Sequence, residues 1–400
     1  MRAWMIPVCF GLALLSVSGA AFAQADGRKA PNATPLPAAK PPVFPTLFPN
    51  PTNNNGYEEW VQAADLIRDN ANVEALDIQP YPTLTLRRRA LADPAVVQAL
   101  ILLRAGLNKP VFSPRTTMDE NTALPEIASF RHLARLLYAE IYVQFADGRV
   151  DAAIGSLRVG LAFGHHVQTD NLISGLVGVA INSIVLKGFS AHLDQLSVYH
   201  CEDVRRIVED FLRVESPAAR LLTLEKGYTL QLLEARRSDA DGLMALIKAG
   251  AGDASNGEDA NVTAVKDYLT AHPSEVNALI DDAQNRVNAL FEQTLLNLRL
   301  PLAQRKPLAR DNTDFPGASL FRVFTTDPQR IMNAYTTDQA RLRMLGVHAL
   351  IHRYRWEHNA LPDALAQLHA ANLVKDAFTG SEIVYKRDGD RYTLTSQGPL

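Results

Sequence analysis

Cysteine is almost absent from this 400-residue chain, which contains only Cys9 and Cys201. Cys9 lies inside an apolar N-terminal stretch that has the form of a removable secretory signal. Once that stretch is cut off, Cys201 has no partner within the chain, so an internal disulfide is excluded even in an oxidising compartment. Because it holds no cross-link, replacing Cys201 by serine is expected to leave the melting temperature nearly unchanged.

Motifs that commonly signal an enzyme or a nucleic-acid partner are missing as well. The chain has no Gly-rich phosphate loop, no Gly-x-Ser-x-Gly nucleophile elbow and no Cys-x-x-Cys pair. Its net charge is −3 and it has no block of basic residues, so we expect no nucleic acid as a partner. With 47% hydrophobic and 21% charged residues, most of the chain should fold around a core.

Long apolar runs are missing beyond the N-terminus. The strongest extends from Leu172 to Leu186 and is interrupted by Asn182 and Ser183. It is shorter than the roughly 20 residues that a spanning helix needs, so it predicts a buried helix. We therefore expect no transmembrane segment after the N-terminal signal is removed.

The N-terminus has the three parts of a secretory signal. Arg2 is positive, residues 5–17 are apolar, and Ala21-Phe22-Ala23 forms an A-x-A cleavage site. We expect residues 1–23 to be a signal peptide, and the protein to be exported to the periplasm or the extracellular space. Residues 24–55 are rich in proline and poor in apolar side chains that could offset the entropy of ordering, so they predict a disordered linker.

Apolar residues recur at three- and four-residue steps through most of the remaining chain, which is the pattern of amphipathic helices. The clearest example is residues 274–299, where Pro273 suits the helix start. Strand-forming residues occur only on either side of Asp388-Gly389-Asp390 and predict a β-hairpin. Further helices are expected in residues 90–107, three within 125–196, then 202–213, 217–248 and 330–358, with the strands in 382–386 and 391–395.

The expected fold class is mainly α: a helical bundle or helix-hairpin array with a small C-terminal helix plus β-hairpin. We expect a helical domain over residues 56–325 and a tail over residues 330–400. A lone hairpin is only marginally stable in water, so a helix should cover one of its faces. The tail helix is expected to do this through a stripe that ends in a buried tryptophan: Leu342, Leu345, Ala349, His352 and Trp356.

Three histidines of the tail, His348, His352 and His358, have the spacing of the zinc ligands in metzincin proteases. That mechanism needs a glutamate beside the first histidine to activate water, but position 349 is alanine. It also needs a glycine before the third ligand, where Arg355 stands. We therefore expect His352 to pack in the helix stripe and no zinc to bind at this segment.

Two other segments could carry chemistry. His165 and His166 are expected at a helix end, where histidine meets the negative end of the helix dipole; a metal site is the alternative. Cys201 is expected at a helix start, which can lower the pKa of a thiol, but its sequence neighbour His200 should not point at it. The sequence thus predicts no catalytic, cofactor-binding or metal-binding residue and no cofactor.

Three short segments follow the long C-terminal helix in a recognisable order. They are Leu361-Pro362-Asp363-Ala364-Leu365, Asp376-Ala377-Phe378-Thr379-Gly380 and Ser396-Gln397-Gly398-Pro399. With the hairpin before the last of them, this part resembles the C-terminal part of the major pseudopilin of type II secretion. The prepilin methylation motif is missing and Leu400 directly follows the last segment, so we carry over neither pilus assembly nor a calcium site.

Residues 132–163 resemble a tetratricopeptide-like helix hairpin, through Ala139, Tyr142, Gly148, Ala153 and Leu157. The spacing is longer than in that repeat and no second clear copy follows, although stacked repeats need about three units to share a core. A plain pair of helices is therefore the simpler prediction. The whole arrangement resembles uncharacterised secreted bacterial proteins with a helical body and a pseudopilin-like tail, which implies no particular activity.

These observations favour a non-enzymatic protein of the cell envelope that binds or scaffolds a protein partner. The alternative is an envelope hydrolase, metal-dependent or not, whose ligands lie apart in the sequence. The missing general base beside His348 favours the first.

Cleavage of the chain after Ala23 is directly testable. Because a small residue at the end of an A-x-A segment is the site at which secretory signals are cut, the mature protein should begin at Gln24. Mass spectrometry of the exported protein should find this N-terminus, and an intact Met1 in the envelope fraction would contradict the prediction.

Overall fold

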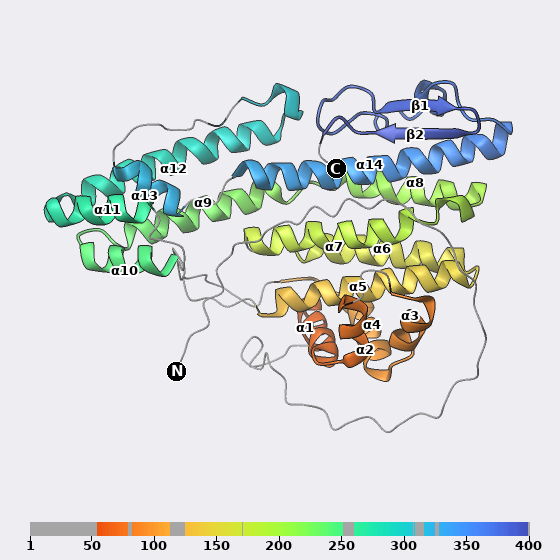
Figure 1. The fold of residues 1–400 in the computed structure, drawn as a ribbon, viewed down its shortest axis with the longest axis horizontal. Coiled ribbons are helices and arrows are strands. Elements are labelled where there is room, and N and C mark those ends of the chain that lie inside the picture. The colour runs from red at the N-terminus through yellow and green to blue at the C-terminus, as the bar shows by residue number, and fades with distance from the viewer. Residues whose placement is uncertain are drawn as a thin grey trace.

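A computed structural model describes residues 54–78, 82–112, 125–169, 171–250, 260–306, 308, 316–324 and 328–398 (Figure 1). The predicted signal peptide and residues 24–53 of the predicted linker lie outside these ranges. Within them the chain is mainly α-helical, with a two-stranded antiparallel sheet near the C-terminus. The predicted fold class is confirmed.

Helices form most of the described chain, and the two strands come near its end. The first helices are α1 (Gly56–Ile67), α2 (Ala71–Ile78), α3 (Leu84–Leu91), α4 (Pro94–Leu107), α5 (Pro125–Ala146), α6 (Val150–His166), α7 (Leu172–Ser190) and α8 (Val198–Arg213). Then come α9 (Ala218–Glu234), α10 (Ala240–Gly250), α11 (Ala260–Ala271), α12 (Val276–Leu298), α13 (Pro316–Phe324) and α14 (Pro328–His358). The strands are β1 (Val384–Asp388) and β2 (Arg391–Thr395), and the short 3₁₀ helices are η1 (Leu193–Gln195), η2 (Pro273–Glu275), η3 (Leu302–Gln304) and η4 (Leu365–Leu368).

Side-chain caps fix where several helices begin. Asn171 and Ser197 each form a capping box, in which the side chain accepts the N–H of the third helical residue, at α7 and α8. Asp93 caps α4 ahead of Pro94, whose missing N–H is harmless at the first position of a helix. These helix starts are therefore encoded locally, before the helices pack.

One of two hydrophobic clusters, the body cluster, is built in layers (Figure 1). α1 to α4 lie against α5, α6 and α7 follow, and α8 and α14 come next, with the hairpin beyond α14. Near α1, the rings of Trp60, Phe130 and Phe163 pack edge to face, and the centroids of Trp60 and Phe163 are 4.9 Å apart. The buried Trp60 indole N–H donates to the carbonyl of Leu103 at 3.2 Å, so its polar group is satisfied.

The other hydrophobic cluster, the arm cluster, lies in α9 to α13 and extends to one side of the body in Figure 1. Leu279, Val287 and Phe291 of α12 are buried in it, and they belong to the apolar steps that predicted this helix. α7 and α14 contribute residues to both clusters. Residues 342–383 of the predicted tail share the body cluster with the helical domain and enclose no separate core.

A helix predicted over residues 217–248 is wrong as a single element, because it is broken in two. α9 ends at Glu234 and α10 begins at Ala240, and Ser238 between them has a φ of 60°. Asp239 caps the new helix, since its Oδ1 accepts the N–H of Gly242 at 2.8 Å. Because apolar residues continue at helical spacing across the break, periodicity alone predicted a single helix.

The predicted hairpin is confirmed, and its turn is tight. β1 pairs antiparallel with β2, so that Val384 lies opposite Thr395 and Asp388 opposite Arg391. The loop therefore has two residues, and Gly389 in it has a φ of 58°, which glycine adopts without strain. The first strand begins two residues later than predicted.

α7 has a composition that would suit a membrane span. It is the one described helix that is long and apolar enough by itself, while α3 and α4 pass only as a pair bent by 73°. In the structure 67% of its most apolar window is buried inside the protein. This burial agrees with the buried helix predicted from residues 172–186.

The tail helix departs from its predicted packing at one position. The three aliphatic residues of the predicted stripe are buried, and the His352 ring lies 6.3 Å from the ring of Tyr392 in β2. Trp356, however, is 63% exposed, and its indole N–H donates to the carbonyl of Leu196 at 3.0 Å. The prediction that Trp356 is buried against the hairpin is wrong, because the tryptophan contacts the segment before α8 instead.

A buried aspartate organises the loop that resembles the pseudopilin segment. Asp376 Oδ1 accepts the N–H groups of Phe378 and Thr379 at 2.7 and 3.1 Å, and its Oδ2 accepts the N–H of Gln397 at 2.8 Å. Burial acts to raise the pKa of Asp376, but the nearby Ser396 and these backbone donors outweigh it and hold the pKa below its usual value. The carboxylate thus joins the loop to the chain after the hairpin.

Replacing Asp376 by alanine should destabilise the protein by about 2–4 kcal/mol at neutral pH, because several buried N–H groups lose their acceptor. The folded-state pKa is lowered, so the carboxylate stabilises the fold above the usual Asp pKa and ceases to do so as pH falls through the folded value. The loss in the variant should therefore shrink in acid. Urea unfolding at several pH values measures it.

The control is Asp363→Ala, because Asp363 pairs with Arg387 in the same tail but its side chain is 81% exposed. This exposed pair should contribute less than about 1 kcal/mol. Equal losses in the two variants would show that the carboxylate of Asp376 does not organise the loop.

Candidate functional site

The last turns of α14 run beside the first turns of α8 in the opposite direction. Arg353 of α14 donates to Glu202 of α8 at 2.9 Å, and the bond from Trp356 to Leu196 lies one α14 turn further on. Tyr199 and Trp356 project into solvent here, with 82% and 63% of their surface exposed. We call the surface formed by these two side chains the aromatic end.

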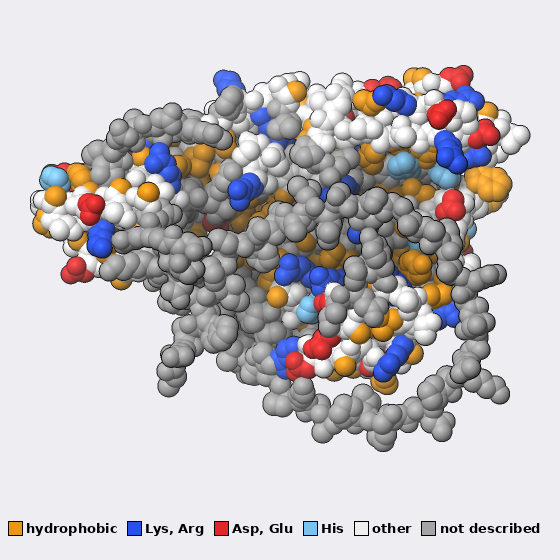
Figure 2. Space-filling view, in the orientation of Figure 1, with side chains coloured by type: hydrophobic (Ala, Val, Ile, Leu, Met, Phe, Trp, Pro, Cys, Tyr) orange, Lys and Arg blue, Asp and Glu red, His pale blue; other side chains and the backbone are white. Residues whose placement is uncertain are grey.

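Exposed aromatic side chains of this size are informative because they are usually at least partly covered in a folded protein. Hydrophobic side chains reach the surface at this end of the molecule, beside α8 and below the hairpin (Figure 2). The hydrogen bond to Leu196 holds the Trp356 ring in place, so little entropy would be lost when a partner packs on it.

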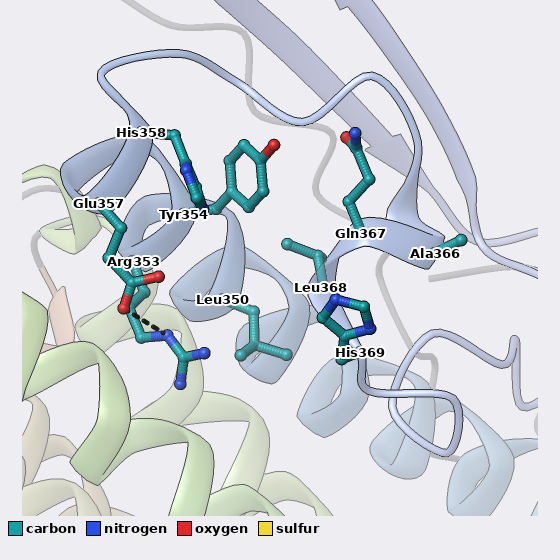
Figure 3. Close-up of a pocket in the computed structure, with 9 residues that line it drawn as sticks. All are labelled: Leu350, Arg353, Tyr354, Glu357, His358, Ala366, Gln367, Leu368 and His369. Carbon is teal, nitrogen blue, oxygen red and sulfur yellow. Dashed lines mark ion pairs between the residues drawn. The ribbon is translucent and has the colours of Figure 1, made fainter.

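A groove of about 480 Å³ lies next to the aromatic end, between the last turns of α14 and η4 (Figure 3). Leu350 and Leu368 are largely buried and form its apolar base. The full lining is Leu350, Arg353, Tyr354, Glu357, His358, Ala366, Gln367, Leu368 and His369. The groove is therefore made by two segments that the chain joins through a single loop.

Polar groups of both segments face this groove. Arg353 Nε pairs with Glu357 Oε1 at 3.3 Å, and the rings of Tyr354 and His358 lie 4.1 Å apart. Gln367 approaches from η4, on the side of the groove opposite the ion pair in Figure 3. The lining offers hydrogen-bond donors, acceptors and aromatic surface.

The three histidines with metzincin spacing do not converge. His348 Nδ1 and the Tyr392 hydroxyl are 2.9 Å apart at the hairpin, whereas His358 lies in the groove. Burial, and secondly His352, lower the pKa of His348 to about 4, so its ring is neutral at pH 7 and packs against the hairpin. Among the described residues, no group of three or more His, Cys, Asp or Glu side chains could hold a metal ion.

His165 and His166 lie in the last turn of α6, as predicted. They line a second cavity of about 320 Å³ together with residues such as Gln168, Ser216 and Arg220. Burial lowers the pKa of both histidines, and His166 and Arg220 lower that of His165 further. Arg220 is engaged by the backbone carbonyls of Gln168 and Thr169, so this cavity has no free cation of its own among the residues described.

Cys201 lies in the first turns of α8, as predicted, but its thiol is not activated. It is 1% exposed, and burial raises its pKa to about 12 although Arg353 opposes the shift. The neighbouring His200 is occupied elsewhere, since its Nδ1 accepts the Ser197 N–H and its Nε2 lies 3.2 Å from Asp151. The lowering that a helix start can cause is absent at this thiol, because desolvation dominates.

The sequence did not single out Tyr199, Tyr354 or Asp338. Tyr199 and Tyr354 carried no signal, because exposure depends on which helix faces remain uncovered after packing. For Asp338 the sequence did contain a signal. It lies at helical spacing between the buried residues Tyr335 and Leu342, on a helix face where a charged residue is rare.

The burial of Cys201 also reverses the expectation that serine can replace it freely. Serine replaces a buried thiol by a hydroxyl that is more costly to remove from water, so Cys201→Ser should cost about 1–3 kcal/mol, more than Cys201→Ala. Urea unfolding of the two variants measures the difference. A serine variant as stable as the wild type would show that the thiol site is polar.

Comparisons with known proteins give no relative from which a function could be carried over. No protein-family model matches the chain, and neither a curated protein nor a solved structure matches it.

Proposed function

We propose that this chain is an exported, non-enzymatic protein that binds a protein partner in the cell envelope through the aromatic end and the adjoining groove. The observation that carries the proposal is the 63% exposure of Trp356 while its indole is held by Leu196. Tryptophan, tyrosine and arginine dominate the binding energy of protein interfaces, and this surface combines Trp356, Tyr199 and Arg353.

The chemistry of the surface supports a protein rather than a small molecule as the ligand. The groove is open to solvent, and the two side chains of the aromatic end lie outside its lining. A small ligand would instead be enclosed over most of its surface. An interface with an aromatic centre and a polar rim has the composition that this surface offers.

The predicted export signal and the resemblance of the tail to a pseudopilin support the cellular setting of the proposal. A partner would be a protein of the periplasm or of the cell surface. Phe378 in the tail's loop around Asp376 is 1% exposed, so this apolar side chain is already covered, whereas the aromatic end remains available.

Photo-crosslinking at the aromatic end tests this function. A photoreactive phenylalanine analogue in place of Tyr199 should give one discrete adduct in the envelope of producing cells. Adding Trp356→Ala should abolish the adduct, because the central aromatic contact is lost. The same variant should lose less than about 1 kcal/mol of stability, since the side chain is mostly exposed.

The matched control is Leu296, which is 60% exposed on α12 in the arm. The analogue at Leu296 should give no such adduct, and Leu296→Ala should leave the Tyr199 adduct intact. A Tyr199 position that gives no adduct, or the same adducts as Leu296, would refute the aromatic end as the binding surface.

A further inference from the structure

α7 and α14 both contribute residues to the arm cluster and to the body cluster. The positions at which they pass from one cluster to the other lie side by side, because Asn182 and Asp338 at these positions are hydrogen-bonded. In α7 the residues before Asn182 include Val179 of the arm cluster, and Val185 after it belongs to the body cluster. In α14 the corresponding residues are Tyr335 before Asp338 and Leu342 after it. We call the boundary at Asn182 and Asp338 the seam.

The two polar side chains of the seam bond to each other and leave one oxygen each unsatisfied. Asn182 Nδ2 donates to Asp338 Oδ2 at 2.9 Å. Asn182 Oδ1 and Asp338 Oδ1 are both buried and have no hydrogen-bond partner. Two acceptor oxygens cannot bond each other, but one hydrogen placed on Asp338 Oδ1 and donated to Asn182 Oδ1 would satisfy both.

The charges around Asp338 do not compensate a carboxylate. Arg341, one turn along α14, donates to Ser183 Oγ of α7 at 2.8 Å rather than to Asp338. On the other side the Tyr335 hydroxyl donates to Gln168 Oε1 at 2.8 Å.

Beyond Tyr335 lies Arg220 of α9, which donates to the backbone carbonyl of Gln168 at 2.7 Å. Burial raises the pKa of Asp338 to about 7, although Asn182 and Arg341 act to lower it. A buried carboxyl group without a bonded cation is favoured in its neutral form.

The helix backbones pack closely around the pair. Gly164 of α6 lies so close that a Cβ atom there would overlap Asn182 Oδ1, and one at Gly178 of α7 would overlap the Gly164 carbonyl. Neither of the two cavities described above is lined by Asn182 or Asp338. The absence of a side chain at these glycines is what lets α6 and α7 approach around the pair.

We propose that Asp338 and Asn182 form a neutral, cyclic acid–amide pair that closes the seam between the two clusters, and that release of the Asp338 proton to solvent opens the seam. In the neutral pair each side chain donates one hydrogen bond and accepts one. In the ionised pair one hydrogen bond is lost and a charge is left in the apolar boundary. The pair is thus a pH-sensitive latch between the body and the arm.

The direction of the pH effect follows from the raised pKa. The folded protein holds the Asp338 proton up to a higher pH than the unfolded chain does, so this group's contribution is complete below the usual Asp pKa of about 3.9. It is lost as pH rises from there through about 7. Each pH unit in this window changes the unfolding equilibrium by up to about tenfold.

Infrared spectroscopy of the whole mature protein tests whether the proton is there. The carboxylic-acid C=O band should be replaced by carboxylate bands with a midpoint near pH 7. Subtracting the spectrum of Asp338→Asn should isolate this change from other carboxyl groups, including Glu225, whose pKa burial also raises. No carboxyl band titrating above about pH 5 would overturn the proposal.

Hydrogen exchange tests whether the proton closes the seam. After correction for intrinsic rates, the amides of α7 and α14 near the seam should lose at least about tenfold in protection between about pH 6 and pH 8. Asp338→Asn should show no such loss, because an amide–amide pair reproduces both hydrogen bonds at every pH. If the carboxyl band titrates but amide exchange does not change, the proposed latch is refuted. It is also refuted if Asp338→Asn shows the same loss of protection as the wild type.

Asp376→Asn is the matched control, because Asp376 is also buried but is held as a carboxylate. This variant should keep the wild-type step in exchange at the seam. Should Asp338→Asn fail to fold, Asn182→Leu replaces it: the midpoint of the carboxyl band should then move, because Asn182 bonds to Asp338 in both of its protonation states. An unmoved midpoint in Asn182→Leu would refute the pairing.

Discussion

The two hydrophobic clusters depend on α7 and α14, which cross from one to the other. α14 has 31 residues and contributes Ile331 and Tyr335 to the arm cluster and Leu342 through Ile351 to the body cluster. A helix that serves two cores fixes their separation and rotation, because it is stiff over this length. The arrangement of the arm relative to the body is thus set by how α14 lies against α7.

Polar residues fix how α7 is aligned against α14, because apolar contacts alone would allow several alignments of similar energy. α7 is so apolar that several rotations about its axis would bury a similar area, but only one brings Asn182 to Asp338 and Ser183 to Arg341. A buried polar group that loses its partner costs about 1–3 kcal/mol, so displaced registers are disfavoured. The same residues that interrupt the apolar run of α7 in the sequence therefore specify its packing.

Much of the fold could be predicted from the sequence, because apolar steps and turn residues report on local structure. The helix over residues 274–299, the plain helix pair of α5 and α6, and the hairpin all carried such signals. The sequence did not predict those features that depend on contacts between segments or on a single local residue. Trp356 lies 14 residues after Leu342 at heptad spacing, but at roughly 100° per residue a straight helix turns it about 40° off the stripe, towards α8. Likewise, Ser238 and Asp239 broke a helix that periodicity had continued.

The candidate site could be predicted least, because exposure results from packing and not from any one segment. Tyr199 and Trp356 come from helices far apart in the sequence, and the antiparallel packing of α8 and α14 brings both to the same end of this helix pair. The same α14 links them to the seam, since it runs without a break from Pro328 to His358. A shift of α14 at Asp338 would be carried to Trp356 along the same helix. The proposed latch and the proposed binding surface are therefore mechanically connected through one helix.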